Sequence, residues 1–135
     1  MAYRSDVKFV IVFNDAVRAA VFRAKAVEDY TSIIHPEWGY ATEEEAKADA
    51  ERVLVLTDRQ IRYSANNVKW YESYPDVMFF ECLLDKSEAA GAEYRFIRIG
   101  EDDSDVEVKQ SRGDNFNLYD DAYSALSLVR SSEFN

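Results

Sequence analysis

The stretch VKFVIVF at residues 7–13 decides the fold class of this chain. In an extended chain its odd-numbered and even-numbered side chains would point to opposite faces, and both sets contain apolar residues. Such a pattern predicts a strand that is buried on both faces and therefore lies centrally in a sheet. The two alternating sets are Val7, Phe9, Ile11 and Phe13 against Lys8, Val10 and Val12. The run is far too short to span a membrane.

Two helices are predicted to follow this strand. The first covers about residues 15–30, with Asp15 near its start and an apolar stripe at three- and four-residue steps. Residues 31–41 are predicted to be a loop that contains His35. The stripe consists of Val17, Ala20, Val21, Ala24 and Val27.

The second helix is predicted to begin at Thr42, which forms a capping box with Glu45. We expect it to continue to about Leu56, because no helix-breaking residue comes before Thr57. The short apolar run 53–56 leaves a buried strand as the alternative.

In the second half of the chain, one strand is predicted before a helix and two strands are predicted after it. A strand at 61–65 is followed by Asn66 and Asn67, which favour a turn or bulge. A helix runs from Pro75, which suits a first helical turn, to Gly91, which suits a C-terminal cap. A strand at 94–99, a polar turn at 100–105 and an antiparallel partner at 106–108 come next. A final helix carries the stripe Leu118, Ala122, Ala125, Leu126 and Val129, and the tail 131–135 is expected to fray.

These elements predict a single α+β domain over residues 1–135, with an antiparallel or mixed sheet and helices packed on one face. Their order is close to the ferredoxin-like β-α-β-β-α-β plan, with an inserted helix and an added C-terminal helix.

The charge of the chain limits its partners. Asp and Glu number 26 against 16 Lys and Arg, for a formal net charge of −10. Such a surface repels nucleic-acid phosphates and anionic lipids, so we expect neither direct nucleic-acid binding nor membrane binding. It favours a partner with a basic protein surface, although the same charge also serves solubility. The single cysteine, Cys82, cannot form an internal disulfide and indicates a reducing compartment, which predicts a cytoplasmic location.

No catalytic residue, cofactor or metal ligand is predicted. His35 is the one histidine, and no nucleophile motif accompanies it. The four glycines are isolated, so no phosphate-binding loop can form. A calcium loop that starts at Asp103 fails, because Val108 and Asp114 occupy the positions that require Gly and Glu. Cys82 is expected to be a buried structural thiol.

Two groups of side chains are the candidate binding residues. The first is aromatic, because Trp and Tyr combine a large apolar face with a polar tip and suit binding hot spots. The second is acidic and would meet a basic partner. The candidates are Trp70, Tyr71 and Tyr74, together with Glu101, Asp102, Asp103, Asp105 and Glu107, and with Glu43, Glu44 and Glu45.

Three segments resemble a group of small acidic proteins encoded by tailed bacteriophages. They are YRSDV at 3–7, VKWYESYPDV at 68–77 and EYRFIRIGE at 93–101. The resemblance implies a phage product that acts in the cytoplasm of a host bacterium. Small phage proteins of this kind are often accessory factors that bind and inhibit host machinery.

The leading hypothesis is an accessory protein that binds and inhibits a basic host protein, such as a nucleic-acid enzyme or an anti-phage defence complex. A small-molecule or nucleotide-signal binder is the alternative, with Arg62, Arg95 and Arg98 as converging cations. An enzyme with a carboxylate-only site ranks third. The sequence leaves open whether the chain forms a homodimer.

Overall fold

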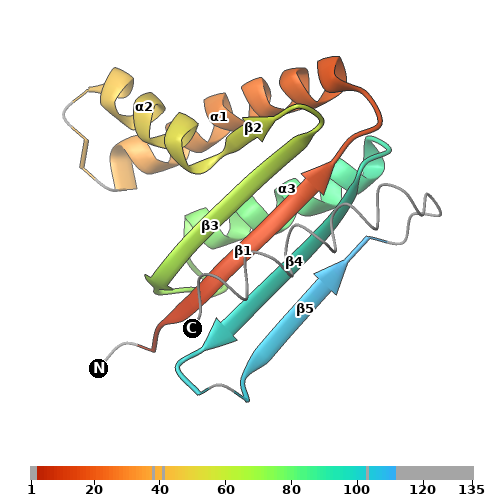
Figure 1. Cartoon of the computed structure of the whole chain (residues 1–135). Coiled ribbons are helices and arrows are strands. Elements are labelled where there is room, and N and C mark those ends of the chain that lie inside the picture. The colour runs from red at the N-terminus through yellow and green to blue at the C-terminus, as the bar shows by residue number, and fades with distance from the viewer. Residues whose placement is uncertain (1–2, 38, 41, 103, 112–135) are drawn as a thin grey trace.

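Strand β1 (Ser5–Val12) lies in the middle of the sheet, as the sequence predicts. The computed structural model describes residues 3–37, 39–40, 42–102 and 104–111. β1 pairs antiparallel with β3 (Gln60–Val68) on one side and with β4 (Glu93–Gly100) on the other. The short strands β2 (Val55–Thr57) and β5 (Val106–Gln110) extend the sheet outward, so the strand order is β2-β3-β1-β4-β5 (Figure 1).

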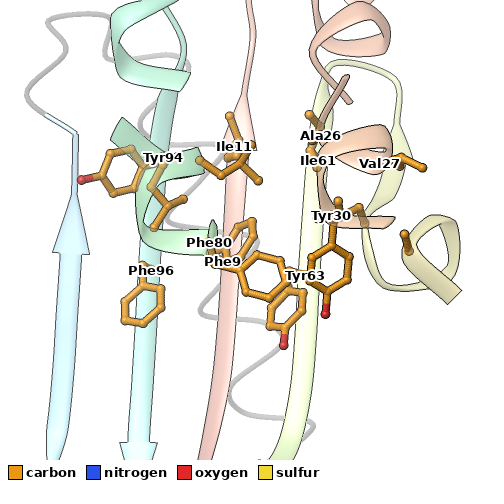
Figure 2. Packing of buried hydrophobic residues seen from close by; sticks show 14 of the residues in the cluster. Phe9, Ile11, Ala26, Val27, Tyr30, Ile61, Tyr63, Phe80, Tyr94 and Phe96 are labelled. Atoms are coloured by element: carbon orange, nitrogen blue, oxygen red, sulfur yellow. The ribbon is translucent and has the colours of Figure 1, made fainter. Parts of the chain in front are cut away.

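Three helices pack against one face of this antiparallel sheet, which we call the helix face. They are α1 (Ala16–Glu37), α2 (Glu43–Val53) and α3 (Pro75–Ala89). Figure 2 shows the core between them, where Phe80 of α3 meets the rings of Phe9 and Tyr63. The Phe80 ring centroid lies 5.7 Å from that of Phe9 and 4.5 Å from that of Tyr63. This aromatic cluster fixes α3 on the sheet.

The opposite side of the sheet, which we call the second face, carries the other half of the β1 alternation. Val10 is paired with Arg62 of β3 and Arg95 of β4, so all three side chains lie on this face. Lys8 is buried there and donates a hydrogen bond from Nζ to Ser64 Oγ over 2.6 Å. β1 is therefore buried on both faces, as predicted.

Most predicted elements are confirmed. The amide of Glu45 donates to Thr42 Oγ1 over 3.1 Å at the start of α2. Pro75 begins α3, and Gly91 adopts a positive φ of 88° just beyond its end. Asn67 also has a positive φ, beside an irregularity in the β1–β3 register. The final helix and the tail 131–135 lie outside the described residues.

The first helix differs from its prediction in length and in orientation. α1 continues to Glu37, so residues 31–37 are helical rather than part of a loop. Of the predicted stripe only Val27 is buried; Val17 is 70% and Val21 66% exposed. The side chains that face the core are instead Ala19, Ala26, Val27, Tyr30 and Ile34. The helix turns this way because the larger Tyr30 and Ile34 remove more apolar surface from water than a stripe of valine and alanine.

Two further predictions are wrong. α2 ends at Val53, and residues 55–57 form strand β2, because their backbone pairs with Gln60, Ile61 and Arg62 of β3. Cys82 is exposed on α3 rather than buried, because α3 directs Phe80, Leu83 and Leu84 at the core.

Candidate functional site

The β4–β5 turn and the aromatic segment 69–74 lie side by side at one end of the sheet, although β4 and α3 separate them in sequence. Figure 1 shows this end at the bottom of the view, where β3 ends and β4 turns into β5. A hollow of about 270 Å³ lies there, and its walls include Tyr3, Tyr71, Glu72, Arg98, Asp105 and Glu107. We call it the hairpin-end site. Its walls also include Trp70, so the site brings together two aromatic candidates, Trp70 and Tyr71, and two acidic candidates, Asp105 and Glu107.

Tyr3 connects the two groups. Its hydroxyl donates to Asp105 Oδ2 over 2.7 Å, and its backbone amide donates to the hydroxyl of Tyr71 over 2.8 Å. The Tyr71 hydroxyl in turn donates to the Tyr3 carbonyl over 3.2 Å. Gly100 lies so close to this contact that a Cβ there would collide with the Tyr3 hydroxyl and the Asp105 carboxylate. The site therefore depends on a residue without a side chain at 100.

Arg98 holds the two acidic residues of the hairpin. Its guanidinium lies 2.9 Å from Asp105 and 3.2 Å from Glu107, and Nη1 also donates to Ser5 Oγ over 3.1 Å. The hydrogen bond from Arg98, followed by that from Tyr3, holds the pKa of Asp105 below its usual range. The hydrogen bond to Asp105 raises the pKa of Arg98. Asp105 and Glu107 are therefore partly neutralised within the chain.

The rim of the site is more acidic than its centre. Glu101 accepts a hydrogen bond from the amide of Arg4 over 3.2 Å, and Asp102 accepts one from the amide of Ser104 over 2.9 Å. That backbone hydrogen bond from Ser104 lowers the pKa of Asp102, so its carboxylate stays ionised. Both side chains are exposed. The negative charge that an approaching partner would meet therefore comes mainly from Glu101 and Asp102 in the turn. The carboxylates paired with Arg98 contribute less.

Trp70 lies deeper than a binding anchor would. Its ring stacks on Phe80 with centroids 5.9 Å apart and also packs 5.9 Å from Phe96. The indole Nε1 is buried and has no hydrogen-bond partner among the described residues. Trp70 therefore forms the floor of the site and part of the core.

Tyr71 and Tyr74 remain nearer the surface. Their rings meet edge to face, with centroids 5.1 Å apart and planes at 87°. Tyr74 is exposed and Tyr71 is half-buried. Together with the exposed ring of Tyr3, they present amphipathic aromatic surface beside the acidic turn.

The other predicted acidic group lies elsewhere. Glu43, Glu44 and Glu45 form the exposed first turn of α2. Figure 1 shows α2 away from the β4–β5 turn, beyond the opposite part of the sheet. Carboxylates at a helix N-terminus stabilise the helix through its dipole, so these residues have a structural role of their own. They do not contribute to the hairpin-end site.

The remaining candidates are placed as follows. Asp103 lies outside the described residues. His35 is half-buried in the last turn of α1. In the described part of the chain, no group of three or more His, Cys, Asp or Glu side chains is arranged to hold a metal ion.

The three arginines suggested for a small-molecule pocket do not converge. Arg62 and Arg95 lie on the second face, on either side of Val10. Arg98 lies on the helix face, where it contacts Ser5 and Asp105. A single anion cannot contact all three.

The exposed side of α1 carries an apolar hollow of about 350 Å³. Phe13, Val17, Val21, Phe22 and Ala90 are among its walls. The valines that the sequence assigned to the core therefore form an apolar surface beside α3, and patches of this kind commonly mark contact surfaces. The sequence pattern alone does not distinguish this stripe from the buried one.

Tyr3 and Gly100 are residues of the site that sequence reasoning did not select as binding residues, and it selected Arg98 only for the small-molecule alternative. Tyr3 and Gly100 fall within the segments that carry the phage resemblance, which is the one signal that could have found them.

None of the helices in the described ranges is long and apolar enough to cross a membrane. Comparisons with protein-family models, with curated proteins and with solved structures found no match to this chain.

Proposed function

We propose that this protein acts by binding another protein with a basic surface, and that the hairpin-end site makes the contact. The observation that carries the proposal is the meeting of Tyr3, Tyr71 and Tyr74 with the acidic β4–β5 turn. Exposed tyrosines supply apolar contact area at low entropic cost, and surrounding carboxylates steer a basic partner toward it.

The partner is proposed to be a protein of a bacterial host. The resemblance of segments 3–7, 68–77 and 93–101 to small phage proteins supports this, as does the net charge of −10. Occupation of a basic surface that normally binds nucleic acid would inhibit the host protein. The function proposed is therefore that of an accessory protein which blocks a nucleic-acid enzyme or a defence complex.

The sheet order supports the ferredoxin-like plan expected from the sequence. The strands β2-β3-β1-β4 are neighbours in that order, with helices after β1 and after β3, and with α2 inserted and β5 added at the edge. Many functions occur on such a plan, so the proposal depends on the surface chemistry of the site rather than on the fold.

The test is affinity capture from a bacterial lysate at low and at high salt, with the captured proteins identified by mass spectrometry. The capture is repeated with Glu101→Lys/Asp102→Lys and with Tyr74→Ala. We expect a basic protein to be captured at low salt, and to be lost with either variant, because one removes the steering charge and the other an aromatic contact.

The matched control is Glu43→Lys/Glu44→Lys, which makes the same charge change at the start of α2. Capture should survive in this control. Equal loss with both double variants would mean that net charge alone drives the association, and unchanged capture with Glu101→Lys/Asp102→Lys would refute the proposed site.

A further inference from the structure

The second face of the sheet is buried although none of the three described helices packs on it. Val10 is 1% and Val12 0% exposed, and Lys8 is also buried. α1, α2 and α3 all pack on the helix face with Phe9, Tyr63 and Phe96. A sheet face without a covering layer leaves its side chains in contact with water. Something else must therefore cover the middle of the second face.

The burial pattern gives the width of that cover. On the second face, Ile99 of β4 is buried along with the β1 residues, whereas Val106 and Val108 of β5 are 48% and 49% exposed. The covered area is thus centred on β1 and β4. Two neighbouring strands span about 10 Å, which is the diameter of one α-helix.

We propose that the chain's own C-terminal segment, residues 112–135, docks on this area of the second face. The contact would be made by the apolar stripe predicted for its helix, which consists of Leu118, Ala122, Ala125, Leu126 and Val129. This is an interaction surface within one chain and does not depend on the function proposed above.

The place where the described chain ends supports this occupant. Ser111 is buried and holds Tyr94 by two hydrogen bonds, from its amide to the Tyr94 carbonyl and from the Tyr94 amide to its hydroxyl, both 3.0 Å long. The chain therefore leaves β5 beside the first residues of β4, at one end of the covered area. Residues 112–117 can reach about 20 Å, enough to turn onto the second face.

The dimensions of the segment also fit. A helix over residues 118–129 would be about 18 Å long. The second-face positions of β4 from Glu93 to Ile99 extend over about 20 Å. One helix of the predicted length would therefore cover the strand pair from end to end.

The charges are complementary. The second face carries three cations, Lys8, Arg62 and Arg95, against two carboxylates, Asp6 and Glu93. In the C-terminal segment, Asp121 lies three residues after Leu118 and therefore borders the docking stripe, whereas Asp120 lies on the other side of the predicted helix. Ion pairs between Asp121 and the cations of the second face would fix the direction in which the helix lies on the sheet.

The test measures how fast a thiol at position 10 reacts with a maleimide in the full-length chain. Cys82→Ser removes the exposed native thiol, and Val10→Cys or Val108→Cys supplies one probe at a time. We expect the thiol at 10 to react at least about tenfold more slowly than that at 108. Ala122→Asp/Val129→Asp should remove this difference by charging the docking stripe. The control Ser124→Asp/Ser127→Asp places the same charges on the other side of the predicted helix and should preserve it.

A second measurement keeps the test valid if the stripe variant fails to fold. Cysteines at 10 and 125, which the docked helix would bring face to face, should form a disulfide within one chain under an oxidant, whereas cysteines at 55 and 125 should not, because Val55 lies on the sheet edge. Failure to bridge 10 and 125 would overturn the proposal. So would slow labelling at 10 in a folded Ala122→Asp/Val129→Asp chain. Labelling at 10 that speeds up when the Val10→Cys chain with an unchanged C-terminal stripe is diluted would assign the cover to a second copy instead.

Discussion

The two faces of the sheet bury the same central strand with different chemistry. On the helix face, Phe9 packs among the rings of Tyr63 and Phe80. On the second face, Val10 lies between Arg62 and Arg95, and Lys8 hydrogen-bonds Ser64. The comparison shows that one face holds the interlocked aromatic core, while the other presents β-branched and cationic side chains. We expect substitutions on the helix face to cost more stability than those on the second face.

The largest expected effect is that of Phe80→Ala, since this ring contacts aromatic side chains from two strands, from α1 and from the segment before α3. We expect the free energy of unfolding to fall by about 3–5 kcal/mol, because the substitution leaves a cavity in a dense core. Urea unfolding followed by circular dichroism measures it. Met78→Ala, at an exposed position of the same helix, should change little. Similar losses for both would show that α3 is not anchored by Phe80.

The second face should give an intermediate effect. Val10→Ala removes about two buried methylene equivalents, so we expect a loss of about 2 kcal/mol in the same urea experiment. The matched control is Val108→Ala, on the same face but half exposed, which should cost less than about 0.5 kcal/mol. If the two substitutions had equal effects, the second face would be open to solvent across its whole width.

The smallest effect concerns the hairpin end, where the helix face meets solvent. Asp105 has a lowered pKa in the folded chain, first because of the hydrogen bond from Arg98 and then because of that from Tyr3. The ionised Asp105 carboxylate therefore stabilises the fold at pH values above the pKa that Asp105 has in the unfolded chain. This stabilisation is lost as the pH falls through the lower pKa of Asp105 in the folded chain. Asp105→Asn should be less stable than the parent near neutral pH, and the difference should vanish in strong acid.

Urea midpoints measured at a series of pH values test this sign. The same substitution in an Arg98→Gln background should show a smaller difference at neutral pH, because the largest cause of the pKa shift is gone. A difference that grows on acidification would contradict the assignment of Arg98 and Tyr3 as the partners of Asp105.

Sequence reasoning succeeded where a local pattern had one solution. The alternation around β1 placed that strand in the sheet centre, Thr42 located the start of α2, and Pro75 located the start of α3. Each of these signals depends on a few neighbouring residues and on steric or hydrogen-bonding rules that act within a turn or two. The α+β class and an antiparallel or mixed sheet followed from them, and the structure shows the antiparallel form.

Sequence reasoning failed where the local pattern allowed two arrangements about equally well. α1 contains two apolar stripes, and packing against β1 and α3 selects the one with Tyr30 and Ile34 rather than the one with Val17 and Val21. Residues 55–57 became a strand because β3 offered an edge, which no local signal records. Tertiary context overrides local preference in both cases.

The hairpin-end site shows the same division. Tyr71, Asp105 and Glu107 were selected by residue type, and the structure brings them together. Their connection through Tyr3 and Arg98 depends on pairing between β1 and β4, which joins residues far apart in sequence. Trp70 was selected for the same reason as Tyr71, yet its ring packs on Phe80 in the core. Residue type predicts what a side chain can do, whereas pairing decides which side chains meet.

The central position of β1 has a consequence for synthesis on the ribosome. β1 is made first, but its two neighbours are β3 and β4, which end at residues 68 and 100. Until those strands emerge, the nascent chain carries an apolar segment with both edges unpaired, a state prone to aggregation. Slow translation or chaperone depletion should therefore lower the yield of the folded protein.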